Sequence, residues 1–201
     1  LFSDAKRRFH NLPNALDFTA AEKEKLLQMF TEQYEMIQRR HPLNPVYVFN
    51  LASLRSVFLG MGAHTALLQK AVKLAPRRGL FRFWLAVEYL HNKDLERAQS
   101  ILQELSEQGL YPGTVDMYLA MIAFLQSDFT DGQKRVLRTL SFYKPVSEEW
   151  DRLTLAYLAQ GDKENLRVWY LRLVRIVEPD PQRQAEVCKQ MTRAISSVER
   201  R

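Results

Sequence analysis

The sequence predicts an all-α protein built from repeated helical hairpins, and three observations lead to this prediction. Apolar residues recur every three or four positions in successive stretches, which gives each stretch the single buried stripe of an amphipathic helix. The same residue types return at a fixed interval of 34 positions. Short breaks at Gly, Asp and Pro separate the stretches. One such hairpin cannot cover both of its apolar faces, so we expect successive hairpins to stack on one another.

The 34-residue interval is clearest in the first helix of each unit, where Leu153-Thr154, Leu119-Ala120, Leu85-Ala86 and Leu51-Ala52 correspond. The same interval relates Asp162, Asp128, Asp94 and Gly60 at the turn, Leu166, Gly132, Ala98 and His64 in the second helix, and Tyr170, Val136, Leu102 and Leu68 four residues later. This pattern resembles the tetratricopeptide repeat, although His64 and Gly132 stand where that family has a small alanine. The resemblance covers residues 45–179 and implies a right-handed α-solenoid with an extra helix at each end.

Residues 1–18 form a basic segment in which Ser3 or Asp4 is positioned to cap a short helix that ends at Pro13. The first residue is Leu1 rather than Met, which indicates an excised fragment. Two interpretations of this terminus stay open. Either Leu1-Phe2 is the tail of a removed membrane span with a basic cytoplasmic flank, or the segment is an ordinary basic terminus.

A half-repeat helix is expected over residues 19–40, because Thr19 and Glu22 have the spacing of a capping box. Its apolar stripe consists of Leu26, Leu27, Phe30, Tyr34 and Ile37. We expect residues 19–201 to form a single domain, with repeats at about 45–78, 79–112, 113–146 and 147–180 and a capping helix at 181–199.

Composition limits the possible function classes. The chain has 201 residues, 46% of them hydrophobic, and no stretch of 18 uninterrupted apolar residues. The single cysteine, Cys188, excludes an intramolecular disulfide and favours a reducing compartment. The net charge is +6 and the pI is about 9.5. A basic surface of this kind can bind nucleic acid, anionic lipid headgroups or an acidic protein. The Lys and Arg residues are spread over many predicted helices, which is typical of solvated faces.

No catalytic pattern is present in the sequence. The four histidines, His10, His41, His64 and His91, lack metal-ligand spacing with another His, Cys or carboxylate. A Gly-rich phosphate loop, a nucleophile elbow and a cysteine pair are also missing from the sequence. We therefore expect a non-enzymatic protein with no cofactor and no metal.

The tetratricopeptide resemblance implies that the first helix of each unit lines a concave inner surface. The positions expected to bind a partner there are Phe49, Asn50, Ser53, Phe83, Trp84, Val87, Leu90, Met117, Tyr118, Met121 and Phe124. These side chains are mainly apolar and aromatic. The co-chaperone subfamily that grips a terminal carboxylate carries Lys, Asn and Arg at such positions, so the sequence argues against that subfamily.

The expected function is a scaffold that holds a partner helix or an extended segment in an apolar groove. The alternatives are a groove covered by the chain itself, a self-association module, and a basic helical repeat that binds nucleic acid. The repeats are similar in kind to the repeat domains attached to bacterial inner-membrane machinery, such as the systems for exopolysaccharide secretion. This narrower placement depends on the start at Leu1 and on the basic flank. The expected location is the cytoplasm, either free or at the inner face of the membrane, with the periplasm as the alternative.

Overall fold

The computed structural model describes residues 19–59, 62, 64–140, 142 and 147–159, and scattered positions between 165 and 189. Every regular element in the described part of the chain is an α-helix. Contacts divide the chain into two compact units, residues 1–94 and residues 95–201. The boundary lies inside the second expected repeat, between its two helices. The expected basic segment 1–18, and most of the expected capping helix 181–199, lie outside the described residues.

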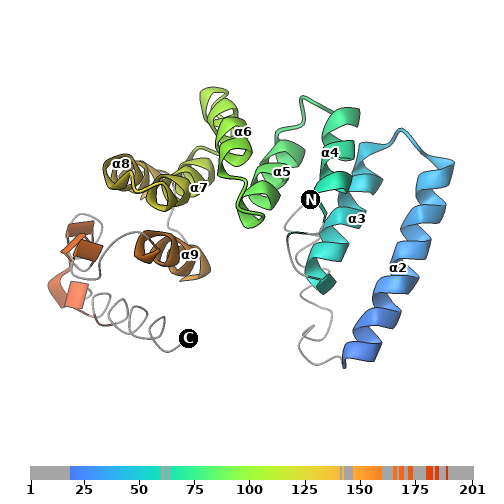
Figure 1. Ribbon diagram of the computed structural model, residues 1–201, viewed down its shortest axis with the longest axis horizontal. Coiled ribbons are helices and arrows are strands. Elements are labelled where there is room, and N and C mark those ends of the chain that lie inside the picture. The colour runs from blue at the N-terminus through green and yellow to red at the C-terminus, as the bar shows by residue number, and fades with distance from the viewer. Residues whose placement is uncertain are drawn as a thin grey trace. The chain divides into compact units, whose positions relative to one another are not determined.

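The first unit contains four described helices, each packed against the one before it in the chain (Figure 1). They are α2 (Ala20–Arg40), α3 (Pro45–Leu59), α4 (Thr65–Leu74) and α5 (Gly79–His91). The predicted capping box at the start of α2 is confirmed. The Thr19 hydroxyl accepts a hydrogen bond from the Glu22 backbone N–H, and the Glu22 carboxylate accepts one from the Thr19 backbone N–H.

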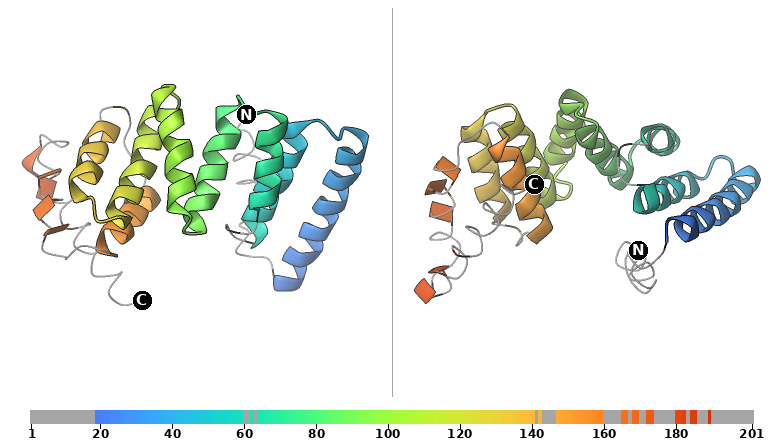
Figure 2. Two further views of the ribbon diagram at one scale, coloured as in Figure 1. Left: turned by 45° about the horizontal axis from the view of Figure 1, so that its top comes forward. Right: turned by 60° about the horizontal axis from the view of Figure 1, so that its bottom comes forward.

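The second unit is organised around α7, which packs against three other described helices (Figure 2). The helices of this unit are α6 (Leu95–Glu107), α7 (Pro112–Leu125), α8 (Phe129–Leu140) and α9 (Ser147–Leu158). A helix that is apolar on all sides must be buried on all sides. Accordingly, α7 is buried at Gly113 and at every residue from Val115 to Phe124.

The turn that follows the first helix of a repeat is the same in the second and third expected repeats, after α5 and after α7. Lys93 and Ser127 both adopt a left-handed backbone, with φ of 62° and 65°. The next residue then donates its backbone N–H to a carbonyl five positions earlier, from Asp94 to Tyr89 and from Asp128 to Ala123. Such a left-handed residue ends a helix and satisfies its last carbonyl groups. Repetition of this turn confirms that the sequence period corresponds to a repeated local structure.

The predicted all-α fold, with neighbouring helices packed on each other, is thus confirmed for the described residues. The expected half-repeat helix at 19–40 corresponds to α2, which spans Ala20–Arg40, and the difference is within the usual uncertainty of such boundaries. Among the described residues, no helix combines the length and apolarity needed to cross a bilayer.

Candidate functional site

Four of the eleven predicted partner-binding residues are partly exposed, and all four belong to the first unit. Asn50 and Ser53 lie on α3, and Trp84 and Leu90 lie on α5. The Ser53 hydroxyl donates to the Phe49 carbonyl one turn earlier at 3.1 Å, which fixes its orientation along the helix. The Trp84 indole packs edge-on against the Phe83 ring, with 5.9 Å between ring centroids. These side chains are the part of the predicted inner surface that solvent can reach.

The other seven predicted residues are buried, so the expectation of an open apolar inner wall does not hold at their positions. They are Phe49, Phe83, Val87, Met117, Tyr118, Met121 and Phe124. The physical reason is that neighbouring helices fill the space beside them. In the first unit, the Phe49 ring on α3 stacks on the Phe81 ring of α5 at 4.7 Å. All four of the predicted residues on α7 are core residues of the second unit.

An aromatic cluster buries Phe124 in the core of the second unit. Its ring meets Tyr157 of α9 edge-on at 5.0 Å and Trp169 at 5.2 Å, and those two rings stack on each other. The same Phe124 ring also lies directly over Gly132 of α8, with no room for a side chain at that position. Gly132 is therefore the residue that admits this ring.

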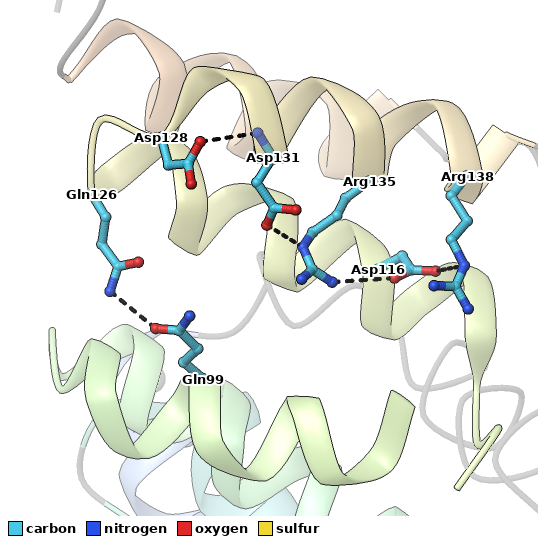
Figure 3. Close-up of polar contacts among 7 residues, drawn as sticks. All are labelled: Gln99, Asp116, Gln126, Asp128, Asp131, Arg135 and Arg138. Atoms are coloured by element: carbon cyan, nitrogen blue, oxygen red, sulfur yellow. Dashed lines mark hydrogen bonds and ion pairs between the residues drawn. The ribbon is translucent and has the colours of Figure 1, made fainter. Parts of the chain in front are cut away.

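A buried carboxylate joins α7 to α8 in the second unit (Figure 3). Asp116 is fully buried, and its oxygens lie 3.0 Å from Nε of Arg138 and 3.5 Å from a terminal nitrogen of Arg135. Arg135 also pairs with Asp131, one turn earlier on α8. Burial raises the pKa of the Asp116 carboxyl, and the positive charges of Arg138 and Arg135 oppose that rise. We interpret this group as a structural tie within the α7–α8 hairpin.

A second buried carboxylate accepts a hydrogen bond from the backbone at the start of α4 in the first unit. Glu88 of α5 is fully buried, and its Oε1 accepts a hydrogen bond of 2.6 Å from the backbone N–H of His64. His64 is the residue that precedes α4, so Glu88 satisfies an N–H at the helix terminus from another helix. The side chain of this glutamate therefore has a packing role, and His64 is buried beside it.

The net charge of the chain is concentrated in the first unit. This unit has 14 lysines and arginines against 8 aspartates and glutamates, which gives +6, whereas the second unit has 15 of each. Residues 36–87 contain eight lysines and arginines and no acidic residue. Sequence reasoning treated the basic residues as evenly spread and missed this partition. The long acid-free run in the sequence is the signal that reveals it.

An open hollow of about 570 Å³ lies within this acid-free region of the first unit. Its walls are the α2–α3 loop, the first two residues of α3 and the residue that precedes α5, namely His41, Pro42, Leu43, Asn44, Pro45, Val46 and Arg78. None of these residues was predicted as a site, because the expected surface was the inner face of the first helices. Within the described residues, no group of three His, Cys, Asp or Glu side chains is placed to hold a metal ion.

No protein-family model matches the chain, and no curated protein matches its sequence.

Proposed function

We propose that the chain is a tetratricopeptide-like, non-enzymatic scaffold whose first unit binds a protein partner through α3 and α5. The observation that carries the proposal is the partition of the candidate residues between the units. The predicted residues that remain accessible, Asn50, Ser53, Trp84 and Leu90, are all in the first unit. Those on α7 are used to build the core of the second unit.

The accessible set has the chemistry of a protein-binding surface. A partly exposed tryptophan and a leucine can anchor apolar side chains of a partner, while an amide and a hydroxyl can pair with its backbone. Tryptophan is among the residues that contribute most to binding energy at such surfaces. The occupant we propose is a helix or an extended segment of another protein.

The wider part of the proposal places this scaffold in a membrane-associated assembly, such as one for bacterial exopolysaccharide secretion. Its support is the resemblance of the repeats together with the basic first unit. Cross-linking of the tagged full chain in cells, followed by mass spectrometry, would identify the assembly. Partners without any membrane-associated component would contradict this placement and leave the binding surface itself to be tested separately.

The surface is tested by comparing Trp84→Ala and Leu90→Ala with Leu155→Ala in quantitative capture of the cross-linked partners. Leu155 is the matched control, because its side chain is 50% exposed and because it lies in the second unit, on α9. This helix is the first helix of the fourth expected repeat. We expect the two variants in the first unit to reduce capture by about fivefold or more, and the control to leave it unchanged. Helical circular dichroism should be the same for all three. Equal capture by wild type and both first-unit variants would refute the proposed surface.

A further inference from the structure

The hollow between the α2–α3 loop and Arg78 has a composition that suits one kind of occupant. Its apolar lining comes from Pro42, Leu43, Pro45 and Val46, and Leu43 is 78% exposed. Its charged lining is Arg78, with His41 as a second basic group. No acidic residue lies among the lining residues or anywhere in residues 36–87.

The groups around the hollow make contacts within the protein that favour a single arrangement. The Arg78 guanidinium lies over the Phe81 ring, 4.8 Å from its centroid, and the His41 ring packs against the Tyr47 ring at 5.8 Å. The Asn44 side chain accepts a hydrogen bond from the Val46 backbone N–H at 3.0 Å. Pro42 and Pro45 restrict the loop between them. Binding to a surface that is already ordered costs less conformational entropy.

Additional positive charge surrounds the hollow on both sides. Arg39 and Arg40 end α2 directly before His41, and Arg77 precedes Arg78, and all of these side chains are exposed. Positive potential from several neighbouring cations, with no acidic residue among the lining residues, attracts an anionic ligand and disfavours a cationic one.

We propose that this hollow binds an acidic peptide segment of a partner protein, one in which carboxylates flank an apolar side chain. In such a complex the apolar side chain contacts Leu43 and the prolines, while a carboxylate pairs with Arg78. The inference rests on the proposed function as a protein scaffold and adds to it a second contact surface and the charge of the partner.

Two other anionic macromolecules fit the observations less well. Proteins that bind single-stranded nucleic acid present exposed aromatic platforms, whereas the only aromatic ring among the lining residues is that of His41, which packs on Tyr47. A bilayer surface is flat and would leave a hollow of several hundred cubic ångströms unfilled. A short peptide segment with several side chains has a size that fits such a space.

The test uses the full chain and three fluorescent peptides of equal length, measured by anisotropy. The first peptide combines Glu with Leu and Phe, the second replaces Glu with Gln, and the third replaces Leu and Phe with Ser. We expect the first peptide to bind about tenfold more tightly than either of the others, and to weaken as salt is raised.

Arg78→Glu and Leu43→Ser should each weaken the first peptide by about fivefold or more. Lys134→Glu is the control, because it makes the same charge change on an exposed residue of the second unit. Leu43 is so exposed that its replacement cannot destabilise the fold appreciably, so this variant still decides the matter if Arg78→Glu fails to fold. Equal affinity for all three peptides, or an unchanged affinity in Leu43→Ser, would overturn the proposal.

Anionic lipid vesicles and a single-stranded oligonucleotide complete the comparison. Tighter binding of either than of the acidic peptide, with the same sensitivity to Arg78→Glu, would also overturn the proposal in favour of that ligand. Partner capture that depends on Trp84 and Leu90 but survives Leu43→Ser would refute the hollow as a site while leaving the proposed function intact.

Discussion

Gly132 shows how one absent methyl group controls the packing of a helical hairpin. A Cβ atom at this position would lie 2.5 Å from Cδ1 and 2.9 Å from Cζ of the Phe124 ring. These distances are far below van der Waals contact. The Phe124 ring cannot move aside easily, because Tyr157 and Trp169 confine it. The close approach of α7 and α8 therefore depends on glycine at this site.

Gly132→Ala should destabilise the protein by about 1–3 kcal/mol through overpacking. In an exposed helix interior the same substitution would be stabilising by about 1 kcal/mol, so the sign itself tests the packing argument. Urea unfolding followed by circular dichroism measures the effect. Adding Phe124→Leu should recover part of the loss, and strictly additive effects of the two substitutions would argue against direct contact.

Asp116 makes the stability of the second unit dependent on pH. Burial raises its pKa above the ordinary value of 3.8, so the folded chain binds this proton more tightly than the unfolded chain does. The stabilising contribution of protonated Asp116 is therefore complete below the unfolded pKa and is lost as pH rises through the folded pKa. The two arginines reduce this loss without reversing it.

The wild type and Asp116→Asn should accordingly differ in a pH-dependent way. The free energy of unfolding of the wild type, minus that of the variant, should fall as pH rises above the ordinary carboxyl pKa of 3.8 and through the raised pKa of folded Asp116. Urea titrations at several pH values measure this difference. A difference that increases with pH would mean that the ion pairs with Arg138 and Arg135 outweigh desolvation of the carboxylate.

At the scale of the helix, α2 and α7 represent opposite extremes of burial. The apolar residues Leu26, Phe30 and Ile37 of α2 are only half-buried, and Met29 and Met36 are 48% and 41% exposed. In contrast, α7 is buried along almost its whole length. A helix with few buried apolar contacts opens locally at a lower free energy than one in a core.

Native-state hydrogen exchange should therefore show early exchange for the amides of α2 and late exchange for those of α7. We expect α7 to exchange only with the most stable part of the second unit. Thr19→Ala, which removes the cap of α2, should speed exchange in α2 and leave α7 unaffected. Equal protection of the two helices would contradict the assignment of α2 as a weakly held element.

Local signals predicted the helices well, and long-range contacts account for what the sequence could not predict. The capping box of α2 follows from Thr19 and Glu22 alone, since both partners lie within one turn. The bond from His64 to Glu88 joins residues 24 positions apart, and nothing local indicates it. Burial of the candidate residues on α7 could not be predicted for the same reason. Continuous apolarity across residues 117–125 indicates a buried helix as readily as an exposed groove wall.

At the scale of the whole molecule, the unequal division of charge affects stability as well as recognition. The first unit carries the entire net charge of +6, and the second unit is neutral. Like charges that are close together repel one another and destabilise the folded state. Salt screens this repulsion, with a Debye length of about 30 Å at 0.01 M and about 10 Å at 0.1 M.

Raising the ionic strength from about 0.01 M to about 0.1 M should therefore increase hydrogen-exchange protection in α4 and α5 of the first unit. Protection in α7 and α8 of the second unit should change less, because its charges balance. The expected gain in the first unit is below about 1 kcal/mol, since most of the cations concerned are exposed. Sucrose is the control, because it favours the compact state of both units without screening charge. If salt protected the two units equally, the partition of charge would have no consequence for folding, and only its role in attracting an acidic partner would remain.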